Sequence, residues 1–171
     1  GLDIREGLSY GGPLLHSVQL DMVWPPPDEL REAFQDFPGE VILQVGGKAI
    51  DKLGGSPERV VERLETYRGV IHRVLLDRSM GQGLGMDALA LLPFARLIGT
   101  KLPEIGLGAA GGLGPTTVEL IKPLLLEFPD ISFDAQGQMR SDGDSSKPIE
   151  WDRARGYVIS SLELLNRCNK V

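Results

Sequence analysis

Three aspartates each follow a short run of strand-like residues. Asp21 follows Val-Gln-Leu, Asp77 follows Val-Leu-Leu and Asp134 follows Ile-Ser-Phe. Ligands of parallel α/β folds bind at the carboxyl ends of the strands, so a carboxyl group there can exchange a proton with a ligand. Partial burial would raise the pKa of such a group and suit it to general-acid work. Asp77 ends an apolar run and is the main catalytic candidate; the alternative is an aspartate that caps a turn.

A glycine cluster, Gly111-Gly112-Leu113-Gly114-Pro115, comes directly before a predicted helix. Glycines let backbone N–H groups approach an anion without a Cβ in the way. The N-terminus of the helix would add its partial positive charge. The cluster therefore predicts a phosphate site, and the alternative is a tight turn that uses glycine only for its backbone angles. It is neither a Walker loop, since no Gly-Lys-Ser/Thr is present, nor a Rossmann fingerprint, since the acidic residue about 20 positions on is missing.

Other reactive side chains point less clearly to chemistry. The glycine-rich loop 81–85 either covers a ligand or simply connects two elements. His16 and His72 begin strands, away from the expected site, and we expect structural or surface roles for both. Cys168 lies near the end of the last helix, where we expect it to be inert. The acidic loop 141–144 lacks the spacing of an EF-hand, so we expect no metal and no cofactor.

The composition is that of an ordinary globular protein. The chain has 171 residues, of which 42% are hydrophobic and 25% charged, and we expect one domain over 1–171. A net charge of -6 argues against a dedicated nucleic-acid binder. A single cysteine excludes an internal disulfide. No apolar run reaches the length of a membrane span and no signal peptide opens the chain, which predicts a cytoplasmic protein.

Strand-like and helix-like segments alternate along the chain, which is typical of consecutive (β/α) units around a parallel sheet. We expect strands at 16–23, 41–45, 71–77, 105–110 and 131–134. We expect helices at 29–37 with Asp28 as N-cap, from Ser56-Pro57 up to Gly69, at 87–98, at 116–128 with a kink at Pro123, and at 151–165. The segments 1–13, 46–55 and 136–148 read as polar or glycine-rich loops.

Several of these motifs, in this order, resemble phosphoribosylanthranilate isomerase, a (β/α)8-barrel enzyme of tryptophan synthesis. They are Val18-Gln19-Leu20, Leu75-Leu76-Asp77, the loop 81–85, and Ala110-Gly111-Gly112-Leu113, which resemble the family's Val-Gln-Leu-His-Gly, Leu-Leu-Asp, Gly-Gly-Thr-Gly and Ala-Gly-Gly-Leu segments. The resemblance runs from about His16 to Gly137. It implies a TIM-type barrel of parallel (β/α) units that is incomplete, with about five of eight strands.

The resemblance also implies a reaction and a set of residues. The reaction is an Amadori rearrangement, an intramolecular aldose–ketose isomerisation of a phosphorylated sugar amine, in which Asp77 matches the general acid. The implied ligand-binding residues are Gly111, Gly112, Gly114, Ala135 and Gly137 at the phosphate, with Gln19 and Asp21 nearby. The implied partner is a phosphorylated small molecule, with no nucleic acid and no membrane.

This sequence departs from the family at several positions. Asp21 stands where the family has histidine, Gln136 and Gln138 replace serines, and no segment matches the strand that ends in the catalytic cysteine. The five strands correspond to the later strands of a barrel, so the chain reads as the C-terminal part of one. Three alternatives therefore stay open: an isomerase or divergent relative, a non-catalytic phosphate-ligand-binding barrel, and a truncated barrel without independent activity. A homo-oligomer could cover the open sheet edges.

Overall fold

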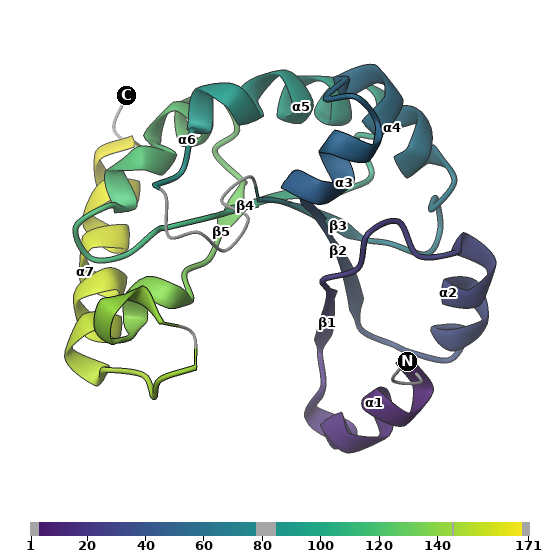
Figure 1. Cartoon of the computed structure of the whole chain (residues 1–171), viewed down its shortest axis with the longest axis horizontal. Helices are drawn as coiled ribbons and strands as arrows, with labels where there is room; N and C mark the ends of the chain where they lie inside the picture. Colours follow the sequence, from purple (N-terminus) through teal and green to yellow (C-terminus); the bar gives the residue numbers. More distant parts are fainter. Residues whose placement is uncertain (1–3, 78–84, 145, 169–171) are drawn as a thin grey trace.

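Five parallel strands form one open sheet in the order β1-β2-β3-β4-β5 (Figure 1). The structure is a computed structural model that describes residues 4–77, 85–144 and 146–168. The strands are β1 Ser17–Leu20, β2 Glu40–Gly46, β3 Arg73–Asp77, β4 Gly106–Ala110 and β5 Ser132–Phe133. The expected α/β fold of parallel (β/α) units is confirmed. A sheet whose strands follow sequence order is consistent with part of a TIM-type barrel, whereas a doubly wound sheet reverses its order.

The two faces of the sheet differ in chemistry. Along β2, alternate residues Val41, Leu43 and Val45 are buried, and the residues between them are partly exposed. The buried face packs against helices, which lie in an arc along the outer side of the sheet (Figure 1). The inner face carries Gln19, Gln44 and Asp77 near its carboxyl end, so the polar side chains of the sheet point away from the core.

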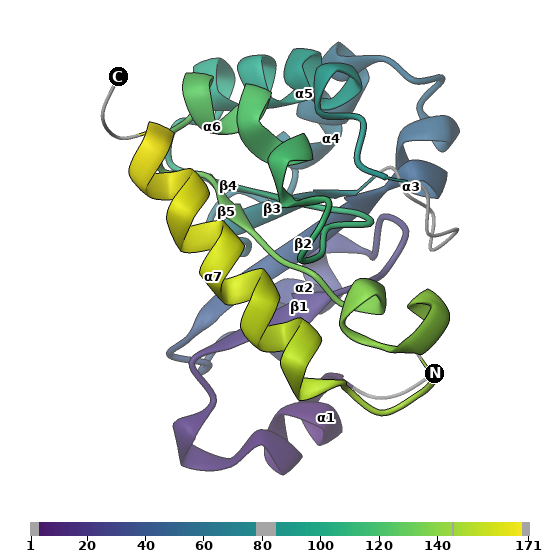
Figure 2. The same cartoon turned by 90° about the vertical axis from the view of Figure 1, so that its left-hand side faces the viewer.

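The helices surround this sheet in chain order. They are α1 Ile4–Gly11, α2 Pro27–Ala33, α3 Gly47–Lys52, α4 Pro57–Glu65, α5 Ala88–Lys101, α6 Lys122–Glu127 and α7 Trp151–Cys168, with short 3-10 turns at Gly12–Leu14, Val118–Ile121, Gly137–Met139 and Ser141–Gly143. The expected cap at Ser56 is confirmed, because its hydroxyl accepts from the Arg59 N–H at 3.3 Å. Asp87, expected as the first residue of a helix, is instead the N-cap of α5 and accepts from the Ala90 N–H at 3.0 Å. α7 packs against α6 and the turn Gly137–Met139 (Figure 2).

Five local expectations were wrong. Helices α1 and α3 replace segments that read as loops, because both contain glycines that resemble turn signals. Asp28 is not an N-cap, since α2 begins one residue earlier at Pro27, where a proline suits the first helical turn. The predicted strand 16–23 ends at Leu20. The predicted helix 116–128 is divided, with a 3-10 turn before α6 and Pro123 in the first turn of α6.

Tyr67 and Trp24 fasten the loop after β1 to the core. The Tyr67 side chain is fully buried, and its hydroxyl donates to the Pro25 carbonyl at 2.6 Å. The Trp24 ring stacks on it with 6.3 Å between centroids and donates from Nε1 to the Ala49 carbonyl of α3 at 2.8 Å. These contacts fix where the residues directly after β1 lie. Within the described part of the chain, no helix has the length and apolar character needed to cross a membrane.

Candidate functional site

A cavity of about 470 Å³ lies at the carboxyl ends of the strands. It receives residues from the end of each of the five strands, as expected for a ligand site in a parallel α/β fold. The structure brings into it the following residues named from the sequence: Gln19, Asp21, Asp77, Gly111, Gly112, Ala135 and Gly137. Segments far apart in the sequence therefore line one cavity.

The glycine loop after β4 has a backbone that only glycine adopts without strain. Gly111 and Gly112 have φ values of 118° and 64°. The Thr117 hydroxyl donates to the Gly112 carbonyl at 2.8 Å and holds the loop closed. The helix expected directly after the loop is displaced: a turn and the 3-10 segment Val118–Ile121 come first, and α6 begins at Lys122. Any anion here would therefore depend on loop N–H groups more than on a helix dipole.

Gly114 does not line the cavity but joins its two glycine-containing loops. A Cβ added at Gly114 would lie 2.5 Å from Cβ of Gln138, which is closer than packed atoms approach. Gln138 belongs to the turn Gly137–Met139 after β5, and this turn also lines the cavity. The absence of a side chain at Gly114 therefore lets the loop after β4 pack directly on the segment after β5.

One carboxylate of the cavity affects the pKa of another. Asp77 ends β3, and Asp134 follows β5, where its N–H donates to the Ala109 carbonyl at 3.3 Å. Surrounding protein atoms desolvate the Asp134 carboxyl and raise its pKa above the ordinary value, and the negative charge of Asp77 raises it further. The Asp134 residue as a whole is nevertheless exposed to solvent, so the desolvation of its carboxyl is partial. The raised pKa that suits a general acid is therefore found at Asp134, whereas the main catalytic candidate expected from the sequence was Asp77.

Gln44 links the inner faces of three neighbouring strands. The Gln19 Nε2 donates to Gln44 Oε1 at 2.8 Å, and Gln44 Nε2 lies 3.4 Å from Asp77 Oδ2, which accepts from it. Gln44 was missed because its strand reads as a continuous apolar run. A usable signal was present: it is the one polar residue between Val41 and Val45, at an inward position of an alternating strand.

Tyr157 of α7 stands behind Asp134. Its ring meets Phe133 edge-on with 6.4 Å between centroids. Burial raises the pKa of Tyr157 to about 12, the Asp134 charge adds to this, and the neighbouring Ser161 hydroxyl opposes it. The Tyr157 and Ser161 hydroxyls are both buried without a hydrogen-bond partner of good geometry among the described residues. Tyr157 therefore stays protonated and uncharged at neutral pH, and it is not among the described residues that line the cavity.

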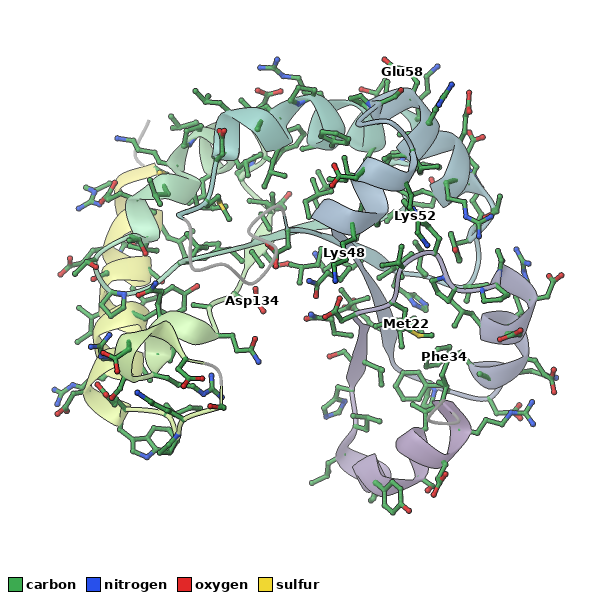
Figure 3. The ribbon with its side chains drawn as sticks, viewed as in Figure 1. Met22, Phe34, Lys48, Lys52, Glu58 and Asp134 are labelled. Atoms are coloured by element: carbon green, nitrogen blue, oxygen red, sulfur yellow. The ribbon has the colours of Figure 1, made fainter. Side chains whose placement is uncertain are left out.

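Lys48 carries the only positive charge among the described residues that line the cavity. It stands in the first turn of α3, directly after β2, and Figure 3 shows Lys48 and Asp134 on two sides of the central opening. The segment 46–53 was read as a loop, so Lys48 was not singled out. Within the described chain, no group of three or more His, Cys, Asp or Glu side chains is placed to hold a metal ion.

The other residues named from the sequence lie elsewhere. His72 accepts at Nδ1 from the Val41 N–H at 3.0 Å, which confirms a structural role. His16 is exposed, and its carbonyl accepts from the Glu40 N–H. Cys168 ends α7 and does not line the cavity. Residues 81–84 of the glycine-rich loop 81–85 lie outside the described residues.

Comparison with known proteins neither assigns this chain to a family nor identifies its function. No protein-family model matches the chain, and no curated protein matches it. Among solved structures, the chain is similar to one described as mutually generated monomers of dimeric phosphoribosylanthranilate isomerase from Thermotoga maritima. That similarity has a TM-score of 0.32 and 12% identity and covers 95% of this chain and 94% of the other. A similarity of this size carries no conclusion about fold or activity, so functional inference rests on the cavity.

Proposed function

We propose that this protein is an isomerase of a small phosphorylated sugar, of the aldose–ketose or Amadori type. The observation that carries the proposal is the shared cavity, in which a glycine loop after β4 lies beside two interacting carboxylates, Asp77 and Asp134. Such an isomerisation needs an anchor for the phosphate and two groups that exchange protons with neighbouring carbons and oxygens. The cavity offers both kinds of group at the carboxyl ends of parallel strands.

The phosphate would bind where the two loops meet. Gly111 and Gly112 keep side chains away from the backbone N–H groups of the loop after β4, and Ala135 and Gly137 do the same on the segment after β5. Because the loops touch at Gly114 and Gln138, both can contact one phosphate. This arrangement supports ligand-binding roles for four of the five small residues implied by the family resemblance. The fifth, Gly114, lies outside the cavity lining and has a structural position between the loops.

We assign the proton-donor role to Asp134 and the acceptor role to Asp77. A carboxyl with a raised pKa holds its proton more firmly, which favours Asp134 as the acid. The Gln44 amide donates to Asp77 Oδ2, which suits a carboxylate that accepts. The family resemblance implied the opposite role for Asp77, in a barrel whose base is a cysteine. Here no cysteine lines the described cavity, and a second carboxylate does.

The proposed steps conserve atoms and electrons. Asp134 gives its proton to the ring oxygen of a phosphoribosylamine, the C1–O bond breaks, and the nitrogen lone pair forms a C1–N double bond. Asp77 then removes the C2 proton; the C–H electron pair forms a C1–C2 double bond, and the C1–N π pair returns to nitrogen. The resulting enaminol loses its hydroxyl proton and gains one at C1, which gives the aminoketose without any oxidant or reductant.

A turnover assay tests this proposal. The unaltered protein should convert a phosphoribosylamine to the 1-amino-1-deoxyketose phosphate, followed by NMR of C1 and C2. Asp77→Asn and Asp134→Asn should each abolish conversion while inorganic phosphate binding, measured by calorimetry, stays within about twofold. Phosphate binding without turnover in the unaltered protein would instead favour a non-catalytic phosphate-ligand-binding protein. That alternative also fits the cavity lining, which contains no cysteine among the described residues.

A further inference from the structure

The last helix of the chain, α7, carries an apolar stripe that faces solvent. Trp151, Val158 and Leu162 follow one another at intervals of seven and four residues, a spacing that places side chains on one face of a helix. All three are exposed, Trp151 by 78% and Leu162 by 56%. Single exposed apolar side chains are normal on a protein surface, whereas several that share one face mark an interaction surface.

Another side of α7 is already covered. Ser161 and Leu164 are buried, and the helix packs against α6 and the turns Val118–Ile121 and Gly137–Met139. Figure 2 shows α7 in front of the rest of the fold along its whole length. The three stripe residues do not line the cavity at the strand ends. The stripe is therefore an uncovered surface of the described chain, separate from the candidate site.

Two opposite charges lie beside the stripe at equal distances from Ile159. Arg155 comes four residues before Ile159 and Glu163 four residues after it, and all three residues are exposed. Within the described chain, neither charged side chain forms an ion pair. If a second α7 lay antiparallel to the first, with the two-fold axis at Ile159, each Arg155 would face Glu163 of the other copy. The pattern is self-complementary, as a two-fold symmetric contact requires.

We propose that α7 is a homodimer interface, in which two copies pack antiparallel around Ile159 with two reciprocal Arg155–Glu163 pairs. The apolar stripe of each copy is then covered by the stripe of the other. The 18 residues of α7 span about 27 Å, so a single helix pair buries less than the roughly 1,600 Å² of a standard interface. The dimer should therefore dissociate on dilution. The proposal does not depend on the isomerase activity, because the stripe and the cavity are separate.

The charges favour a second copy over a lipid surface as the occupant of this face. A helix that lies on an anionic membrane carries basic residues around its apolar side. Here the stripe is flanked by one residue of each sign, and the net charge of -6 opposes association with anionic lipids. A second copy of the chain, in contrast, supplies the opposite charge at both positions.

Sedimentation equilibrium of the full chain over a range of concentrations tests the interface. The unaltered protein should approach twice the monomer mass as its concentration rises. Arg155→Glu and Glu163→Arg each place like charges opposite one another, so each should raise the dissociation constant of the dimer by about tenfold or more. The double variant, Arg155→Glu with Glu163→Arg, exchanges the two charges and should recover the original dissociation constant to within about threefold.

Arg59→Glu is the matched control for net charge. Arg59 is exposed on α4, and the helices pack in the order α4, α5, α6, α7, so that two helices separate it from the interface. It changes the net charge by the same amount as Arg155→Glu but should alter the dissociation constant by less than about twofold. Leu162→Glu tests the stripe and should give a monomer with an unchanged circular dichroism spectrum, because Leu162 is exposed.

Each other outcome would overturn the proposal in a defined way. A monomer at every concentration would exclude the dimer, and binding of that monomer to vesicles of phosphatidylcholine and phosphatidylglycerol would identify a lipid surface as the occupant. A dimer that Leu162→Glu left intact would have its interface elsewhere. Equal weakening by Arg59→Glu would make net charge the cause, and a double variant that failed to recover would exclude the antiparallel register centred on Ile159.

Discussion

The amide nitrogen of Gln44 lies 3.4 Å from Oδ2 of Asp77, on the next strand of the sheet. The orientation of that amide is fixed from its other side, because Gln44 Oε1 already accepts from Gln19 Nε2 at 2.8 Å. Gln44 therefore presents hydrogens, and not its oxygen, to the carboxylate. Three strands thus contribute to the placement of one catalytic candidate.

Replacing Gln44 by leucine should slow turnover without preventing phosphate binding. Leucine keeps similar bulk but cannot donate to Asp77, so the carboxylate loses one restraint on its orientation. We expect kcat for the phosphoribosylamine to fall about 10- to 100-fold, with the calorimetric affinity for inorganic phosphate unchanged. Gln35→Leu, at an exposed position outside this cavity, serves as the matched control and should leave both quantities unchanged.

A Gln44→Glu variant sharpens that prediction. The carboxylate introduced beside Asp77 would repel its charge and raise the pKa of the resulting pair of carboxyl groups, so the remaining activity should shift to higher pH. If Gln44→Leu and Gln44→Glu gave the same loss and no change in the pH profile, Gln44 would be a packing residue and not a positioning residue for Asp77.

Much of the fold was predictable because its signals are local. The apolar runs of the strands and the caps at Ser56 and Asp87 depend on neighbouring residues, and these elements were placed to within a few residues. Helix α3 was not predictable in this way. Its first residue is Gly47, and it is stabilised by burying Ala49 and Ile50 against the core, which is a tertiary contact that a local pattern does not show.

The candidate site, like the fold, was predictable where its signals are local in the sequence and not where they depend on tertiary contacts. The strand-end rule placed Asp21, Asp77 and the glycine loop at one edge, and the structure brings them into one cavity. The raised pKa of Asp134 depends on desolvation and on Asp77, which is distant in sequence. Lys48 enters the cavity only because α3 forms. Properties that depend on contacts between elements were therefore not predictable from the sequence. They include the effect of one carboxylate on the pKa of another and hydrogen bonds between side chains of neighbouring strands.

Asp134 should make the protein less stable as pH rises. Its pKa is raised in the folded state, so the folded protein holds more protons than the unfolded chain between the ordinary value of 3.8 and the raised value. The free energy of unfolding therefore falls as pH rises through that interval, and the full penalty is present above it. Asp134→Asn removes the penalty and should be more stabilising, relative to the unaltered protein, at pH 7 than at pH 3.

Urea unfolding at the two pH values measures this difference. Asp36→Asn is the control, because Asp36 lies in the exposed turn after α2, outside the cavity. The Asp36 variant should show the smaller dependence on pH. An Asp134→Asn variant that was relatively more stable at pH 3 than at pH 7 would reverse the sign and contradict the desolvation of this carboxyl.

Gly114→Ala should damage the phosphate site by pushing its two loops apart. The added Cβ would lie 2.5 Å from Cβ of Gln138, and neither atom is the free end of a flexible side chain. We expect a loss of about 1–3 kcal/mol in the free energy of unfolding and weaker binding of inorganic phosphate. Gly7→Ala, in α1, meets no atom within 4 Å and should cost nothing.

A second substitution tests the cause of that loss. Gln138→Gly removes the atom that the new Cβ meets, so the double variant Gly114→Ala, Gln138→Gly should recover part of the phosphate affinity lost by Gly114→Ala alone. Purely additive losses in the double variant would show that the strain lies in the Gly114 backbone and not in its contact with Gln138.

Tyr67→Phe should loosen the loop that carries Asp21 into the cavity. The Tyr67 hydroxyl is buried and donates to the Pro25 carbonyl at 2.6 Å, and phenylalanine would leave that carbonyl without this donor. We expect a loss of about 1–2 kcal/mol in the free energy of unfolding, measured with urea. Tyr10→Phe removes a hydroxyl of a tyrosine that is 77% exposed and should change stability very little.

The position of the loop gives this substitution a second readout. Because Trp24 stacks on Tyr67 and donates to Ala49, its indole fluorescence reports on the same anchor. Trp151 is the other tryptophan of the chain and lies far along it on α7, so a Trp151→Phe background isolates the Trp24 signal. In that background, Tyr67→Phe should increase quenching of Trp24 by acrylamide. Lower stability with unchanged quenching would mean that the hydroxyl supports the core and not the loop at the cavity.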